Sequence, residues 1–153
     1  MLPSRAATLG RKDFKMREIL FRGKTHNGEW KQGYYVEQYG AKEIYLPDGV
    51  DREYGFDHYH VIPETVGQYT GLTDKNGKKI FEGDIVLFED ESPSNYEYHD
   101  CTEMRCGAIE YGDNCFYITD RIAVEMEDLI YDGKLDVEVI GNIHDNPELL
   151  QGE

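Results

Sequence analysis

The sequence lacks the short motifs that mark several common enzyme classes. Its 153 residues contain neither a Walker A motif nor a G-x-G-x-x-G fingerprint, so neither kind of phosphate-binding loop is present. No apolar stretch approaches the roughly 18 residues that a membrane-spanning helix needs. We therefore expect a soluble, cytoplasmic protein with no membrane partner and no motif-defined nucleotide site.

Residues 1–15 also lack the apolar core of about 7 to 15 residues that a secretory signal requires, although they contain basic and small residues. We expect this stretch to be a flexible or extra segment, and Met16 to be the original start of the protein.

Basic residues are scarce in the second half of the chain. Residues 1–81 contain 13 Lys/Arg and 11 Asp/Glu, whereas residues 82–153 contain 3 Lys/Arg and 20 Asp/Glu. The second half therefore has a net charge of −17, which disfavours direct nucleic-acid binding through phosphates. Two interpretations stay open: a solvated acidic surface, or a surface that binds a basic protein partner, for example by mimicking nucleic acid.

Three glycine-containing turns predict β-hairpins. They are Asn27-Gly28, Asp74-Lys75-Asn76-Gly77 and Gly112-Asp113-Asn114, each between segments with alternating apolar residues. Gly83 predicts a second tight bend before the apolar run at 85–88. We expect Pro47 and Pro63 to end strands, and Pro147 to open a last helical turn through Leu150.

The last predicted strand covers residues 135–143. It alternates cleanly, with Leu135, Val137 and Val139 facing inward. The segment 123–131 fits either a helical turn or a short strand.

Three ordered segments resemble the YopX family of phage and prophage proteins. They are Met16-Arg17-Glu18-Ile19-Leu20-Phe21-Arg22, the run 66–86, and the tail 139–150 with Gly141-Asn142-Ile143-His144-Asp145-Asn146-Pro147. The resemblance implies a mainly β protein in a bacterial host cell, with an SH3-like barrel on its C-terminal side. We accordingly divide the chain into residues 1–15, an N-terminal β-rich region at 16–65, and a barrel core at 66–150.

A long acidic loop is the predicted partner-binding segment. Serine, proline, asparagine and charged residues replace the apolar pattern between residues 89 and 100. The predicted contact residues are Glu89, Asp90, Glu91, Tyr96, Glu97, Tyr98 and Asp100. A mobile insertion without a partner is the alternative interpretation.

Two candidate metal sites are weak. Cys101, Cys106 and Cys115 with His99 have the spacing H-x-C-x4-C-x8-C instead of paired C-x2-C, which favours reduced and mostly buried thiols. His58 and His60 would share one face of a strand, but nothing identifies a third ligand. We therefore predict no catalytic residue, no metal and no cofactor.

Two functions of different class remain. The favoured one is a non-enzymatic phage or prophage accessory protein that binds a host or phage protein, or a small molecule. The alternative is a metal-assisted hydrolase or nucleotide-processing enzyme with a site assembled from His58, His60, Glu82 and Asp84. A homo-oligomer is compatible with both, because hairpin edges and tyrosines offer pairing surfaces.

Overall fold

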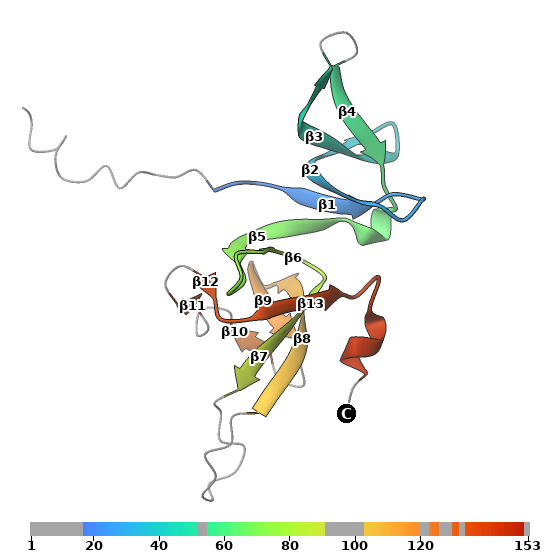
Figure 1. The fold of residues 1–153 in the computed structure, drawn as a ribbon. Helices are drawn as coiled ribbons and strands as arrows, with labels where there is room; N and C mark the ends of the chain where they lie inside the picture. Colours follow the sequence, from blue (N-terminus) through green and yellow to red (C-terminus); the bar gives the residue numbers. More distant parts are fainter. Residues whose placement is uncertain are drawn as a thin grey trace, which may run out of the picture.

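The protein is mainly β and is built from antiparallel strands (Figure 1). The structure, a computed structural model, describes residues 17–51, 55–90, 103–119, 123–125, 130–131 and 134–151. In this part of the chain the strands form a six-stranded sheet, a five-stranded sheet and a two-stranded pair. This confirms the predicted fold class. No helix among the described residues is long and apolar enough to cross a membrane.

The N-terminal sheet has the strand order β4-β3-β2-β1-β5-β6. Its strands are β1 (Phe21–Lys24), β2 (Trp30–Gln38), β3 (Ala41–Asp51), β4 (Gly55–His60), β5 (Gly67–Thr73) and β6 (Lys79–Phe81), with the short helix η1 (Pro63–Thr65) before β5. Strand β5 pairs with β1, with Phe21 opposite Gln68 and Arg22 opposite Gly67. The sheet therefore continues across residue 65, and the proposed division there stays a prediction.

The turns of this sheet form where the sequence predicts them. Gly28 and Gly77 have φ angles of 91° and 84°, which glycine adopts without the steric cost of a side chain. In the β5–β6 turn, Asp74 Oδ1 accepts the N–H groups of Asn76 and Lys78, each at 2.9 Å. Asp74 Oδ2 accepts the N–H of Val139 at 3.1 Å. The turn is therefore also attached to the last strand of the protein.

The C-terminal sheet has the strand order β10-β9-β8-β7-β13. Its strands are β7 (Asp84–Asp90), β8 (Glu103–Gly112), β9 (Cys115–Thr119), β10 (Ala123–Glu125) and β13 (Glu138–Asn142), while β11 (Ile130–Tyr131) pairs with β12 (Lys134–Leu135) and η3 (Pro147–Leu150) follows β13. Asp113 and Asn114 both have positive φ, at 48° and 66°, as a tight two-residue hairpin turn requires.

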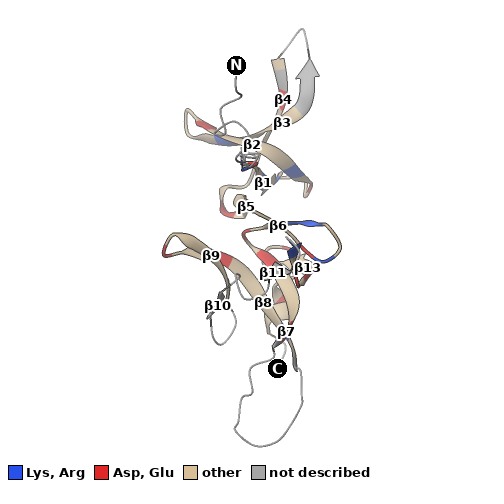
Figure 2. Ribbon diagram, turned by 90° about the vertical axis from the view of Figure 1, so that its left-hand side faces the viewer, with Lys and Arg blue, Asp and Glu red and all other residues tan. Residues whose placement is uncertain are grey.

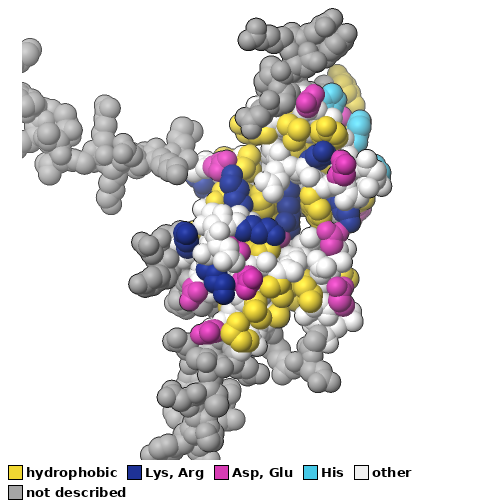
Figure 3. Space-filling model, in the orientation of Figure 1, with side chains coloured by type: hydrophobic (Ala, Val, Ile, Leu, Met, Phe, Trp, Pro, Cys, Tyr) yellow, Lys and Arg dark blue, Asp and Glu magenta, His cyan; other side chains and the backbone are white. Residues whose placement is uncertain are grey.

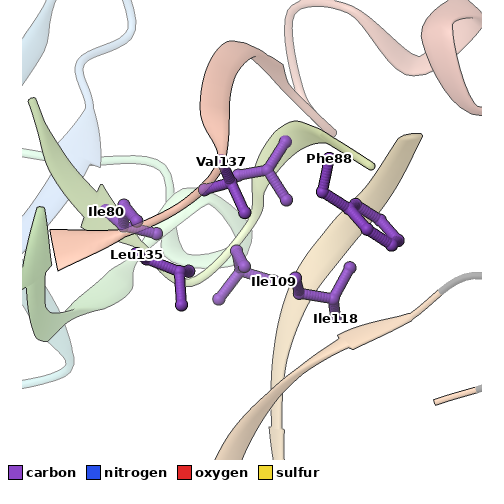
Figure 4. Close-up of a cluster of buried hydrophobic side chains, with 7 residues drawn as sticks. Ile80, Phe88, Ile109, Ile118, Leu135 and Val137 are labelled. Carbon is purple, nitrogen blue, oxygen red and sulfur yellow. The ribbon is translucent and has the colours of Figure 1, made fainter. Parts of the chain in front are cut away.

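The main hydrophobic core lies on one face of this sheet (Figure 4). Alternate residues of β7, β8 and β9 point into it because side chains in a strand alternate between faces. Its buried members are Ile80, Val86, Phe88, Ile109, Ile118, Leu135 and Val137. A second cluster consists of Leu20, just before β1, Tyr69 of β5 and Phe81 of β6.

Several local predictions need correction. Strand β3 continues through Pro47 to Asp51, and the pairing with β4 shifts register between Tyr45 and Val50. Proline is tolerated there because an irregular register does not need its N–H. The predicted strand 135–143 is split into β12 and β13, since the N–H of Val137 turns back to the carbonyl of Leu135 at 2.8 Å.

The SH3-like barrel stays a prediction. Among the described strands, β10 and β13 are the two edges of the C-terminal sheet, and no pairing between them closes it. The predicted inward positions are correct for Leu135 and Val137, which are buried, and Val139 packs against the same core.

Candidate functional site

A polar cluster joins the two sheets where β1, the β6–β7 turn and the segment after β13 meet. We call it the junction cluster; it consists of Arg22, Lys24, Trp30, Asp84, Asn142, His144 and Asp145. Arg22 is 8% exposed, and its Nη1 lies 2.6 Å from Oδ1 of Asp84, which is 1% exposed. The guanidinium also lies over the Trp30 ring, 4.8 Å from its centroid. This pair is a buried electrostatic contact between the sheets.

Asp145 forms the second contact of the junction cluster. Its Oδ1 lies 2.5 Å from Lys24 Nζ, and its Oδ2 accepts the indole N–H of Trp30 at 2.7 Å. Asn142 orients this carboxylate: its Nδ2 donates to Asp145, and its Oδ1 accepts the backbone N–H groups of His144 and Asp145. The segment after β13 is thereby fixed against β1 and β2.

The junction cluster shifts three pKa values. Burial raises the pKa of Asp84, although Arg22 and the Phe81 N–H oppose the shift. Burial and the neighbouring Arg22 lower the pKa of His144. Hydrogen bonds from Lys24 and Trp30 lower the pKa of Asp145 to about 2. The geometry pairs both cations of the cluster with carboxylates, Arg22 with Asp84 and Lys24 with Asp145, which makes it a structural contact.

The N-terminal sheet exposes tyrosine and histidine side chains from β2, β3 and β4. His58 is opposite Tyr45 and His60 is opposite Glu43, so the two histidines share a face as predicted. The His58 ring stacks on Tyr45 with centroids 4.9 Å apart, and His60 Nε2 lies 3.4 Å from Glu43 Oε1. These contacts give both histidines partners within the sheet.

The four residues of the hydrolase hypothesis are not gathered into a metal centre. His58 and His60 are on β4, whereas Asp84 is paired with Arg22 in the junction cluster. Within the described residues, no group of three His, Cys, Asp or Glu side chains is placed to hold a metal ion.

The predicted partner-binding loop begins later than expected. Glu89 and Asp90 belong to β7, where they pair with Met104 and Glu103 of β8, because the ladder between the two strands continues to this point. Glu89 is exposed. Glu91, Tyr96, Glu97, Tyr98 and Asp100 lie outside the described residues.

The cysteine prediction is wrong for Cys115, and Cys106, which is opposite Leu87, also lies on the face away from the core. Cys106 is half-buried, but Cys115 is exposed at the start of β9, beside the turn. Alternation places Cys115 on the face away from the core, so its apolar character did not indicate burial. Cys101 lies outside the described residues.

The C-terminal sheet has an outer face opposite its core, and this face is both apolar and acidic. Leu87, Cys106 and Met104 are neighbours on β7 and β8, and Met104 is 49% exposed. Figure 3 shows hydrophobic side chains gathered over β7 and β8 with acidic ones beside them. The register places three carboxylates on this face: Glu89, Glu110 and Glu138.

The basic residues of this region lie elsewhere. Among the described residues of β7, β8 and β9, no Lys or Arg points to the outer face, since Arg105 is opposite Phe88 on the core side. Lysines gather in the β5–β6 hairpin, which is blue in Figure 2. One of them, Lys75, reaches Glu138 at 3.7 Å, an exposed contact that contributes little. The outer face is thus the best candidate for binding a basic partner.

This face and the junction cluster were not identified from the sequence. The register of β7 with β8 decides which side chains share the outer face. The junction cluster had a partial signal in Asn142-Ile143-His144-Asp145, since an asparagine after a strand commonly caps the next two N–H groups.

These features define a small, mainly β protein of two linked antiparallel sheets. The family model described as YopX protein matches residues 20–151, and the chain belongs to the YopX family. No curated protein matches the sequence at a significant level.

Solved structures include one with a similar fold. It is the crystal structure of protein EF1440 from Enterococcus faecalis, with a TM-score of 0.52 and 24% sequence identity. The match covers 87% of this chain and 98% of that chain. At this identity the likeness supports the arrangement of the strands.

Proposed function

We propose that this YopX family member is a non-enzymatic binding module of a phage or prophage, and that it binds a protein partner with a basic surface. The carrying observation is the outer face of the C-terminal sheet, where Glu89 and Glu138 flank the apolar side chains of Leu87, Cys106 and Met104, and Glu110 lies farther along β8. Opposite charge favours encounter with a basic partner, and apolar contact area slows its dissociation.

The surrounding charge supports the same proposal. Residues 82–153 have a net charge of −17, so a basic surface is attracted to this half of the protein over a distance of several ångströms. The attraction is screened by salt, with a Debye length of about 10 Å at 0.1 M ionic strength. Binding through this face should therefore weaken steeply as salt rises.

Affinity capture with a salt series tests the proposal. The tagged full chain is incubated with lysate of the bacterium that carries the gene, and bound proteins are eluted from about 0.05 M to about 0.5 M salt. We expect a basic protein that elutes as salt rises. The variant Glu89→Lys, Glu110→Lys, Glu138→Lys should lose it.

A matched variant controls for total charge. Glu37→Lys, Asp57→Lys, Glu64→Lys makes the same change at exposed positions of the N-terminal sheet and η1 region, and should keep the partner. Capture of no basic protein at any salt concentration, or equal loss in both triple variants, would contradict the proposal.

A further inference from the structure

The outer face of the C-terminal sheet arranges its apolar and acidic side chains in a regular order. Directly opposite residues on antiparallel strands share a face, so Leu87 and Cys106 form one row and Glu89 and Met104 form the next. Glu138 extends the first row from β13. Carboxylates therefore lie directly beside the apolar side chains at strand spacing.

Exposure increases along this face toward the end of β7. Ile85 and Ala108 are buried, Leu87 and Cys106 are half-buried, and Met104 is 49% exposed. Strand β8 also contacts η3. The exposed apolar surface is thus confined to the part of the face that Glu89 and Glu138 flank.

From this arrangement we infer that the outer face binds an extended segment of the partner in which lysine or arginine alternates with large apolar residues. This inference rests on the proposed function and names the part of the partner that is recognised. The apolar side chains of the segment contact Leu87, Cys106 and Met104, while its cations reach Glu89 and Glu138. The charge of the face selects this occupant over two others. An acidic segment would be repelled by the like charge of the face, and a purely apolar segment would leave the carboxylates unpaired.

Fluorescence anisotropy with designed peptides tests the inference on the full chain. The probe is a labelled 12-residue peptide of alternating lysine and leucine; a second peptide replaces leucine with serine, and a third replaces lysine with glutamate. We expect the first peptide to bind in a salt-dependent way, and the other two to bind at least about tenfold more weakly.

Variants locate the binding. Met104→Ser should weaken the lysine-leucine peptide about tenfold. Tyr34→Ser is the matched control, because Tyr34 is similarly exposed, at 53%, but lies on β2 of the other sheet. It should leave the affinity unchanged. Alkylation of Cys106 in the wild-type chain gives a second readout, and bound peptide should slow it.

Three outcomes would overturn the inference: equal effects of Met104→Ser and Tyr34→Ser, equal binding of the lysine-serine peptide, or unprotected Cys106 at saturating peptide. Light scattering could reveal a fourth such outcome. A dimer of this chain that the Met104→Ser variant dissociates would show that a second copy of the chain occupies the face. The proposed function is tested separately. If the Met104→Ser variant still captures a basic partner, the proposed binding of a basic partner is kept, and the proposal that the partner contacts the apolar part of the outer face is wrong.

Discussion

Replacing Arg22 with methionine should destabilise the protein by about 3 to 5 kcal/mol at pH 7, the usual cost of removing one partner from a buried ion pair. The variant leaves the Asp84 carboxylate buried without its countercharge. Asp84 Oδ1 lies 2.6 Å from Arg22 Nη1, and Oδ2 accepts the N–H of Phe81 at 2.8 Å. Methionine keeps most of the apolar stem of arginine, so the substitution removes the charge and leaves much of the packing.

Urea unfolding measures this loss. With a slope of about 2 kcal/mol per molar urea, a loss of about 4 kcal/mol lowers the midpoint by about 2 M. The double variant Arg22→Met, Asp84→Leu removes both charges and should recover most of the stability, because an apolar pair replaces the ion pair at little cost. A loss below about 1 kcal/mol for Arg22→Met at pH 7 would refute the reasoning.

The pH dependence gives an independent check. Burial raises the pKa of Asp84, so the folded carboxyl binds a proton more readily than the unfolded one. Stability from this group therefore falls as pH rises above about 4. Arg22→Met removes the cation that opposes the raised pKa of Asp84. The stability that the protein loses through this substitution should therefore be larger at pH 7 than at pH 4. Equal destabilisation at both pH values would contradict this account.

Three further predictions concern single side chains and are measured by the same urea assay. Asp145→Asn should cost about 1 kcal/mol at pH 7, discounted for partial exposure; the pKa of Asp145 is about 2, so this stability is present above about pH 4 and is lost as pH falls toward 2. A pH-independent difference would contradict it. Asp74→Ala should cost about 2 to 4 kcal/mol, because three backbone N–H groups lose their acceptor; an unchanged midpoint would show that water replaces the carboxylate. Gly33→Ala should prevent normal pairing, since a Cβ there would lie 2.0 Å from the carbonyl oxygen of Tyr45, whereas Gly28→Ala meets open space and should cost only about 1 kcal/mol for its positive φ. Similar losses in the two glycine variants would contradict the difference.

Hairpins could be predicted because their chemical causes are local. Asn27-Gly28 and Asn76-Gly77 place a glycine at the position of positive φ, and the neighbouring alternation fixes the strands. The structure confirms both turns and the bend at Gly83. Pro47 shows the limit of the same reasoning. We predicted that a strand ends at Pro47, but this residue lies within β3, where the pairing with β4 shifts register.

The contacts between sheets could not be predicted, because they join residues that are distant in the sequence. Lys24 and Asp145 are 121 positions apart, and neither has a local pattern that names the other. The outer face could not be predicted either. Met104 and Glu89 become neighbours only through the pairing of β7 with β8, whereas the sequence pattern predicted a loop at Glu89.

The position of β13 has a consequence for how the protein is made. Strand β7 is paired with β8, which follows it in the sequence, and with β13, which is synthesised much later. During translation the other edge of β7 thus stays open until residues 138–142 have emerged from the ribosome. Closing this long-range pairing also carries a large entropic cost, which slows folding. A nascent chain stalled before residue 138 would therefore present an unpaired edge strand to chaperones or to other chains.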